Sequence, residues 1–352
     1  MTPIAEGTSL AVLAAILFGL TTPVLQRAGV DADPFSTAML LYAGAAMATL
    51  PLSRAQRHEP PVGRRHVLRL VAVALAGGMA APALFAWGLQ HTSGTSASLL
   101  LNFEAIFTAL LAWRLYGEAL GHRALAAIAL MSAGGVVLAW TTGATSGGPD
   151  RAGWGAVAVV AAMLAWALDN ALTRPLADLD PIQVVRFKGG LGALASLVLF
   201  ATLGHAFPGW PHALAILACG ATGYGASLRL YLLAQRRIGA ARTGSLFALA
   251  PFVGAAVAWA LGERGVGGPT LLAAAFFALA VFLHLTERHA HRHTHGRLVH
   301  EHRHGHDDGH HDHRHDPEVV GEHSHLHAHD PRTHEHPHAP DAHHGHRHET
   351  AN

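Results

Sequence analysis

Long apolar runs separated by short polar connections fill the first 288 residues of the chain. A run of about 20 mostly apolar residues is long enough to cross a bilayer as a helix. Runs close to this length occur at residues 8–27, 34–53, 68–90, 96–116, 122–141, 153–173, 183–204, 212–234, 243–262 and 269–286. Nothing in these runs favours strands. The pattern predicts an all-α integral membrane protein with ten transmembrane helices.

The runs divide into two related halves. The run at 99–118 ends in Gly-Glu, and so does the run at 245–263. Aligning Gln90 with Gln235 also aligns both Gly-Glu pairs, each residue lying 145 positions from its counterpart without a gap. Five helices in each half would place the halves in opposite orientations in the membrane, with a substrate site between them near the midplane. We therefore predict two inverted five-helix repeats.

These repeats set the expected domain boundaries. We expect the first repeat at 8–141, a short Gly-rich linker at 142–152, the second repeat at 153–286 and a separate tail at 287–352.

Composition and charge agree with a membrane protein. The chain is 51% hydrophobic and 13% charged, which is too apolar for an ordinary soluble domain. With the N-terminus inside, the inner connections carry ten arginines and the outer ones three, the bias that sets cytoplasmic loops apart. No basic segment precedes the first run, so we expect a retained helix and not a cleaved signal. We expect a bacterial-type cytoplasmic (inner) membrane, with both termini cytoplasmic.

The repeats resemble a known family. An aromatic-small pair in the first helix, an Asp-Pro before the second and a Gly-Glu at the end of the fourth occur in both halves: Phe18-Gly19 and Trp166-Ala167, Asp33-Pro34 and Asp180-Pro181, Gly117-Glu118 and Gly262-Glu263. In these features the chain resembles the EamA domains of the drug/metabolite transporter (DMT) superfamily. The resemblance implies a ten-helix inner-membrane secondary transporter that moves small metabolites, often by proton antiport. Repeat two keeps the fourth-helix proline typical of that family, Pro251, whereas repeat one has Glu104-Ala105 there.

Several polar side chains lie inside the apolar runs, where a charge costs about 2.5–3.5 kcal/mol and needs a partner or a water-filled cavity. Glu104 is the main candidate for proton coupling, with Asn102 nearby; the alternative is a protonated or paired glutamate that only fixes packing. Asp169 and Asn170 either line the pathway or pair with Arg174. Lys188, the sole lysine, could neutralise a carboxylate or bind an anion. We interpret Arg229 mainly as a structural partner for a carboxylate.

The repeated Glu118 and Glu263 end their helices beside small residues. Because both halves have this glutamate, we predict a shared structural role and not direct contact with substrate.

The tail has a different chemistry, since 23 of the 30 histidines follow residue 288. Few apolar residues remain, so we expect disorder without a ligand. Imidazoles two residues apart on an extended chain can bind one divalent cation, and Zn²⁺, Ni²⁺ and Co²⁺ suit them. A tail that becomes cationic in mild acid is the rival interpretation. The candidate ligands are His302, His304, His306, His310, His311, His313, His315, His323, His325, His327 and His329.

The functional hypothesis is a secondary transporter, expected to be a proton-coupled exporter of a small metabolite, whose tail binds or senses divalent metal. One alternative is a divalent Zn, Ni or Co exporter, and another is a membrane-anchored metal storage or sensor protein. We expect no enzyme activity, no required cofactor and no nucleic-acid partner. The expected partners are the lipid bilayer and a small-molecule or ion substrate, and the sequence leaves a homodimer open.

Overall fold

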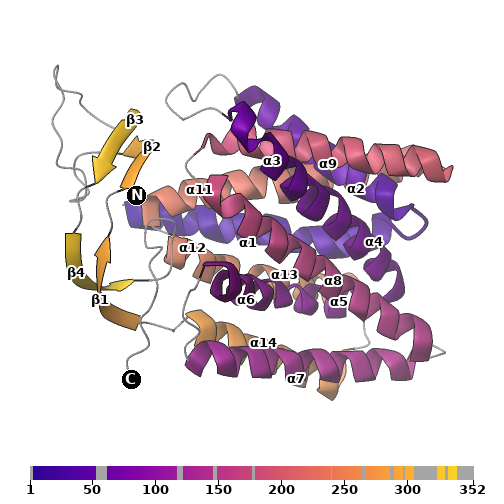
Figure 1. The fold of residues 1–352 in the computed structure, drawn as a ribbon. Coiled ribbons are helices and arrows are strands. Elements are labelled where there is room, and N and C mark those ends of the chain that lie inside the picture. Colours follow the sequence, from indigo (N-terminus) through magenta and orange to yellow (C-terminus); the bar gives the residue numbers. More distant parts are fainter. Residues whose placement is uncertain are drawn as a thin grey trace.

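The computed structural model describes residues 3–52, 62–116, 122–145, 149–176, 179–238, 240–263 and 266–285, and in the tail 289–295, 298–304, 323–329 and 332–338. The described part of residues 3–285 is helical, and its long helices lie side by side in a bundle (Figure 1). The N-terminus lies at the same end of this bundle as the tail strands (Figure 1).

Each predicted apolar run contains helix. The first half contains α1 (Pro3–Ala28), α2 (Pro34–Thr49), α3 (Val67–Val73), η3 (Ala74–Ala80), α4 (Ala81–His91), α5 (Gly94–Leu100), α6 (Phe103–Tyr116) and α7 (His122–Thr145). The second half contains α8 (Pro149–Thr173), α9 (Pro181–Leu203), α10 (Trp210–Cys219), η5 (Gly220–Ala226), α11 (Ser227–Ile238), α12 (Ala240–Phe247), α13 (Ala250–Ala260) and α14 (Gly268–Leu285). Single 3-10 turns follow α2 (η1, Leu50–Leu52), precede α3 (η2, Arg64–His66) and follow α8 (η4, Arg174–Leu176).

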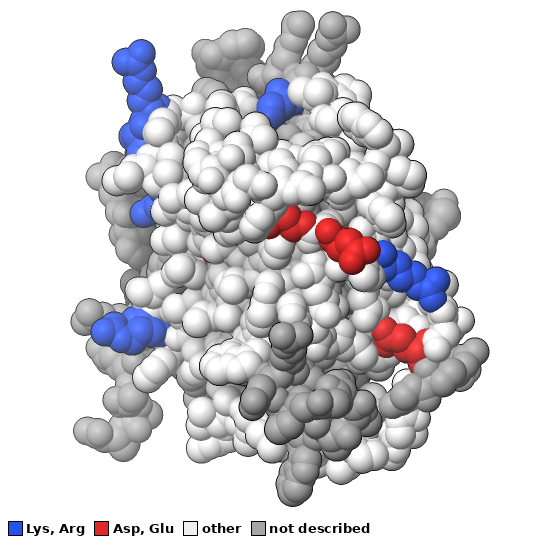
Figure 2. Space-filling view, turned by 90° about the vertical axis from the view of Figure 1, so that its right-hand side faces the viewer, with Lys and Arg blue, Asp and Glu red and all other residues white. Residues whose placement is uncertain are grey.

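Six of the described helical stretches are long and apolar enough to cross a membrane. These are Ala5–Ala28, Arg64–His91, Gly94–Leu115, Gly153–Thr173, Ile182–Leu203 and Trp210–Ala234. The chain is therefore a multi-pass membrane protein. The face at the end away from the tail is largely uncharged, with scattered acidic and basic side chains (Figure 2).

The duplicated Asp-Pro pairs start equivalent helices. Asp33 caps α2, its Oδ1 accepting from the backbone N–H groups of Phe35 and Ser36 at 2.9 Å each. Asp180 caps α9 in the same way, accepting from the N–H of Ile182 at 2.9 Å. The proline that follows needs no hydrogen-bond partner at the first helical position and has a helical φ. The sequence motif is thus a helix start.

Each half contains a π-helical segment in its third long helical stretch, η3 and η5, at positions 146 residues apart. Glycines in these segments lie where no side chain would fit. A Cβ on Gly77 would overlap the carboxylate of Asp169 on α8, and a Cβ on Gly223 would overlap Thr21 on α1. The π segments therefore bring the backbone of one half against a helix of the other.

The fourth helical stretch of each half is interrupted. Residues 101–102 separate α5 from α6, and residues 248–249 separate α12 from α13. The starts of α6 and α13 lie 147 positions apart, two more than the offset of the Gly-Glu motifs. When the two helix starts are aligned, Glu104 of repeat one is equivalent to Pro251 of repeat two. A constant offset of 145 would instead make it equivalent to Leu249.

Contacts between the halves come in corresponding pairs. Helix α1 packs against α11 and α13, as α8 packs against α4 and α6. Likewise α2 packs on η5, and α9 packs on η3. α2 and α9 also contact each other, as do α7 and α14. Most helices of the second half thus contact helices of the first half.

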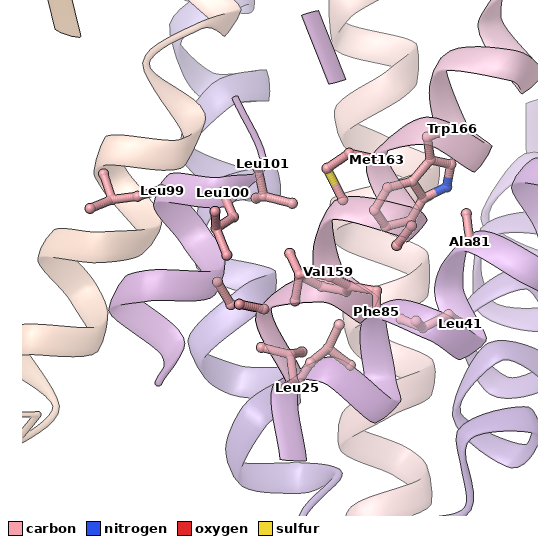
Figure 3. Packing of buried hydrophobic residues seen from close by; sticks show 14 of the residues in the cluster. Leu25, Leu41, Ala81, Phe85, Leu99, Leu100, Leu101, Val159, Met163 and Trp166 are labelled. Carbon is pink, nitrogen blue, oxygen red and sulfur yellow. The ribbon is translucent and has the colours of Figure 1, made fainter. Parts of the chain in front are cut away.

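Buried apolar side chains from both halves form the centre of the bundle. Leu25, Leu41, Phe85, Val159 and Met163 belong to one cluster, together with Leu99 to Leu101 and Trp166 (Figure 3). These residues come from α1, α2, α4, α5, the break after α5 and α8, so the interrupted stretch containing α5 is fixed against the second half.

Helix and strand also occur in the two segments that lie outside the expected repeats. Helix α7 continues to Thr145 and α8 begins at Pro149, so helix extends into the linker expected at 142–152. In the tail, four strands are described. β1 (His289–His295) pairs antiparallel with β4 (Arg332–His338), and β2 (Leu298–His304) pairs with β3 (His323–His329). Ladder hydrogen bonds satisfy the backbone without a hydrophobic core, which composition alone does not reveal.

We predict that Gly192→Val on α9 destabilises the bundle, because a Cβ at Gly192 would lie 2.8 Å from the Cα and carbonyl oxygen of Gly78. Overpacking of this kind costs about 1–3 kcal/mol. Gly190→Val is the matched control, since nothing lies within 4 Å of a Cβ there. Thermal unfolding of purified protein in detergent should show a lower midpoint for Gly192→Val only. Equal midpoints would contradict the close approach.

Candidate functional site

Glu104 joins the two halves of the chain. It lies in the first turn of α6, where the partial positive charge of a helix N-terminus favours a carboxylate. Its Oε1 accepts a hydrogen bond from Nδ2 of Asn170 on α8 at 2.8 Å. Glu104 is half-buried and Asn170 is exposed. The predicted pair of polar residues therefore forms a direct contact between repeat one and repeat two.

Asp169, the neighbour of Asn170, forms a buried ion pair with Lys188 of α9. The side chain of Asp169 is 2% exposed and that of Lys188 is 19% exposed. Thr173 donates a further hydrogen bond to Asp169 Oδ1 at 3.3 Å. The sequence left open whether Asp169 pairs with Arg174, and the structure gives it Lys188. Removing either partner would leave a charge buried among helices.

The carbonyl of Gly77 in η3 lies beside this ion pair and accepts two side-chain hydrogen bonds. The donors are the hydroxyl of Tyr42 on α2 and Nε1 of Trp166 on α8, the latter at 3.0 Å. A π-helical turn changes the backbone bonding pattern, so a carbonyl can become available to side chains. Tyr42 and Trp166 are themselves 3.4 Å apart, between the Tyr hydroxyl and Nε1.

Aromatic rings extend this arrangement into the second π segment. Tyr224 of η5 lies with its ring centroid 5.8 Å from that of Tyr42, 5.6 Å from Phe18 and 6.1 Å from Trp166. Phe18 and Trp166 are the aromatic members of the duplicated aromatic-small pair. The motif thus places one aromatic ring from each half beside the polar side chains.

We name Glu104, Asp169, Asn170 and Lys188, with Tyr42 and Trp166, the central polar cluster. Glu104 lies close enough to both Asp169 and Lys188 to interact with them electrostatically. The cluster contains two carboxylates and one lysine. With Asp169 and Lys188 paired, a charge on Glu104 has only the amide of Asn170 as a described hydrogen-bond partner. Protonation of Glu104 is therefore the simplest way to change the charge of the cluster.

Other predicted residues lie elsewhere. Asn102 is buried at the break between α5 and α6, where its Nδ2 donates to the carbonyl of Leu99 at 2.8 Å. It closes the end of α5. Arg229 is exposed on α11, and within the described residues no ion pair joins it to Glu104 or Asp169. The role of Arg229 as a partner for a carboxylate therefore stays a prediction.

Glu263 binds the start of a helix in the other half. Its Oε1 accepts from the N–H of Gly94 at 2.7 Å, and its Oε2 accepts from the N–H and the hydroxyl of Thr95 at 2.9 and 2.8 Å. It thereby supplies partners to the first turn of α5. Glu118, the equivalent residue of repeat one, lies outside the described residues. A pocket of about 240 Å³ adjoins Glu263, lined also by Pro23, Gln26, Arg27 and Gly262, away from the central polar cluster.

Sequence reasoning missed several members of the site. The sequence does not single out Tyr42, and it marks Trp166 only as part of the duplicated aromatic-small pair. Trp166 is in fact buried, at 6% exposure. The duplicated aromatic-small pair was the available signal, because Trp166 belongs to it. Nothing in the sequence marks Gly77 as an acceptor, since that depends on the π segment.

No metal centre is present among the side chains that the structure describes, which belong to residues 5–283: no group of three or more His, Cys, Asp or Glu there could hold an ion. Cys219 is buried and free. Of the predicted tail ligands, His306, His310, His311, His313 and His315 lie outside the described residues, and the others lie on β2 and β3.

Comparison with known proteins identifies a family and proteins similar to this chain. Residues 5–140 and 153–286 each match the model of the EamA-like transporter family. A protein of Methanothermobacter thermautotrophicus named an uncharacterized transporter is 29% identical over 236 residues, covering 64% of this chain and 68% of that protein. A solved crystal structure superposes with a TM-score of 0.59 at 18% identity, covering 79% of this chain and 95% of its own, which indicates a shared fold.

We predict that Lys188→Met alone destabilises the protein by about 3–5 kcal/mol, because it leaves the carboxylate of Asp169 buried without its countercharge. The double variant Asp169→Asn/Lys188→Met should recover most of this loss, since neither charge remains. The check is a double-mutant cycle of thermal unfolding in detergent. Additive effects of the two substitutions would contradict the ion pair.

We also predict that Glu263→Gln lowers stability by about 1–2 kcal/mol, because the neutral amide oxygen accepts more weakly from the first turn of α5. Thr95→Val should have a smaller effect, as it removes one hydroxyl and keeps both backbone donors. Unfolding midpoints of both variants test this order, and a larger effect for Thr95→Val would refute it.

Proposed function

Because this chain belongs to the EamA-like transporter family, we propose that it is a proton-coupled secondary transporter of a small organic metabolite in the cytoplasmic membrane. In this proposal it spans the membrane ten times as two inverted five-helix repeats, with both termini in the cytoplasm. It exports its cargo, and its His-rich tail binds divalent metal.

The inverted arrangement is supported by the corresponding contacts of the two halves. Helix α1 packs on α11 and α13 as α8 packs on α4 and α6, which is the correspondence expected if a two-fold axis relates the repeats; in an inverted repeat that axis would lie in the membrane plane. The interrupted stretches α5–α6 and α12–α13 are equivalent, and the break between α5 and α6 is buried at Leu101 and Asn102. Transporters of this kind bind cargo where such broken helices meet.

The central polar cluster is the observation that carries the proposal. Glu104 comes from the first repeat, and Asp169, Asn170 and Lys188 come from the second. A rocking motion of one repeat against the other would break or remake the Glu104–Asn170 contact. Ionisable residues within membrane helices commonly mark ion and proton pathways. A proton on Glu104 would weaken its attraction to Lys188, so proton binding and repeat movement are linked.

Aromatic rings beside the cluster favour an organic cargo. Phe18, Tyr42, Trp166 and Tyr224 provide flat apolar surface next to hydrogen-bonding groups, as small-molecule sites do. A divalent Zn, Ni or Co exporter is the alternative, and the histidines of the tail are the observation that favours it. The described membrane residues, however, hold no cluster of soft or imidazole ligands for such a cation.

The test uses purified protein in proteoliposomes that contain a pH-sensitive dye. Amino acids, amines, nucleosides and the cations Zn²⁺, Ni²⁺ and Co²⁺ are added one at a time against a proton gradient. We expect at least one organic compound to cause proton movement. Proton movement caused by the cations and by none of the organic compounds would favour the metal exporter.

We predict that Glu104→Gln abolishes proton-driven accumulation of the cargo while cargo-for-cargo exchange continues, because the amide cannot exchange a proton but still fits the site. Glu263→Gln is the control carboxylate outside the cluster and should retain coupling. Wild-type proton coupling in Glu104→Gln would remove this residue from the mechanism.

A further inference from the structure

The pocket beside Glu263 lies between the two halves, at the end of the bundle away from the tail. Arg27, which lines it, is in the last turn of α1, and the N-terminus lies at the tail end (Figure 1). The volume of about 240 Å³ is below the roughly 300–1,000 Å³ of pockets for drug-sized ligands, so the pocket suits a smaller group. The lining residues are Pro23, Gln26 and Arg27 of repeat one and Ala258, Leu261, Gly262 and Glu263 of repeat two.

Two opposite charges line this pocket, and no ion pair joins Arg27 to Glu263. Among the described residues, Arg27 makes one hydrogen bond, from Nη2 to the carbonyl of Leu261. A guanidinium has five N–H groups, so most of them remain for a ligand. Oε1 of Glu263 accepts one bond, from the N–H of Gly94, and a carboxylate oxygen can accept two. Each half therefore offers the pocket a charged group with bonding capacity left.

These charges select the chemistry of a ligand. An anion alone would be attracted by Arg27 and repelled by Glu263, and a cation alone would meet the reverse. A phosphoethanolamine group satisfies both, because its phosphate can bind the guanidinium while its ammonium group donates to the carboxylate. A phosphocholine group has the same charges, but its quaternary ammonium has no N–H to donate. The pocket therefore favours phosphoethanolamine.

An exposed apolar stripe of α1 leads to the pocket. Its residues are three or four positions apart, which places them on one face of the helix. They are Leu13, Ile16, Leu20 and Val24. Arg27 continues this spacing and is exposed as well. Because α1 belongs to one of the membrane-spanning stretches, the stripe is exposed to lipid acyl chains. A lipid lying along it would place its headgroup beside Arg27.

Exposed tryptophans place the pocket at the level of the headgroups. Trp259 of α13 lies four residues before Glu263 and is exposed. Trp87 is exposed near the end of α4. Gln90, close to it, donates from Nε2 to the carbonyl of Gly29, directly after α1, at 2.7 Å. Tryptophan is enriched where membrane helices meet the headgroups, so the ends of α1, α4 and α13 lie at this level.

We propose that this pocket binds the headgroup of phosphatidylethanolamine, with the phosphate on Arg27 and the ammonium group on Glu263. The acyl chains lie along the apolar stripe of α1, and the bound lipid bridges the two repeats. In the orientation proposed above, the lipid belongs to the outer leaflet; the site itself does not depend on that orientation. Because the pocket lies away from the central polar cluster, the lipid acts on stability and not on proton coupling.

The experiment measures lipid binding to full-length protein in detergent by native mass spectrometry. Phosphatidylethanolamine, phosphatidylcholine and phosphatidylglycerol with identical acyl chains are titrated separately, and a dissociation constant is obtained for each. The variants are Arg27→Gln, Arg27→Lys and Glu263→Gln. Arg69→Gln is the matched control, since Arg69 is exposed on α3 and does not line the pocket.

We expect the wild type to bind phosphatidylethanolamine most tightly. Arg27→Gln should weaken this binding about tenfold or more, because hydrogen bonds to a charged phosphate are lost, and Arg27→Lys should weaken it less. Glu263→Gln should lose the preference for phosphatidylethanolamine over phosphatidylglycerol, since the repulsion of the anion is removed. Arg69→Gln should keep the wild-type affinity. Equal binding of the three lipids by the wild type, or an unchanged affinity in Arg27→Gln, would overturn the site.

Free phosphoethanolamine separates a lipid from a soluble ligand. It is added to the wild-type protein as a competitor for phosphatidylethanolamine. We expect it to compete only weakly, because it lacks the chains that lie along α1. If it bound as tightly as the lipid, a soluble zwitterion and not a phospholipid would be the ligand. Neither measurement involves transport, so a failure here is distinct from a failure of the transport proposal.

Discussion

The ion pair between Asp169 and Lys188 is the interaction on which the rest of the site depends. A buried carboxylate without a partner would cost several kcal/mol, so the chain must bring α8 and α9 together at this depth. Neighbouring residues help to accommodate this ion pair. Gly77 leaves room for the carboxylate, and its carbonyl binds Tyr42 and Trp166, which hold α2, η3 and α8 together. Among the described residues Glu104 has the amide of Asn170 as its hydrogen-bond partner, which is why we propose it as the proton-binding member of the cluster.

The two halves share the same π segments and helix breaks but differ in the side chains at these positions. Both contain a π segment whose glycine packs on a helix of the other half, yet Gly77 faces Asp169 whereas Gly223 faces Thr21. Both fourth stretches are interrupted, yet Glu104 of repeat one occupies the position equivalent to Pro251 of repeat two. A proline and a carboxylate serve different purposes there: the proline fixes a helix start, while the carboxylate brings a charge that can be neutralised by a proton. Duplication thus supplied two breaks in the helices, and only one of them acquired a titratable group.

The tail follows a different rule, because its strands are held by backbone pairing and not by a core. Alternation of histidine with other residues gives each strand one face rich in imidazole. Register then decides whether those faces meet. In each ladder the two strands run antiparallel, so residues from distant parts of the tail come to opposed register positions.

The sequence by itself determined the positions of the helices, the duplication and the family. Apolar length fixes a membrane helix, because every backbone group must bond within the segment, and the Asp-Pro and Gly-Glu motifs mark helix ends through local hydrogen bonds. The sequence also singled out Glu104, Asp169 and Lys188, because charges in apolar runs are conspicuous. Only the tertiary structure decided their partners. It paired Asp169 with Lys188, placed Arg229 at an exposed position on α11 and brought in Tyr42 and Trp166. Those contacts depend on where π turns and helix breaks place backbone atoms between distant segments, and no local pattern specifies that geometry.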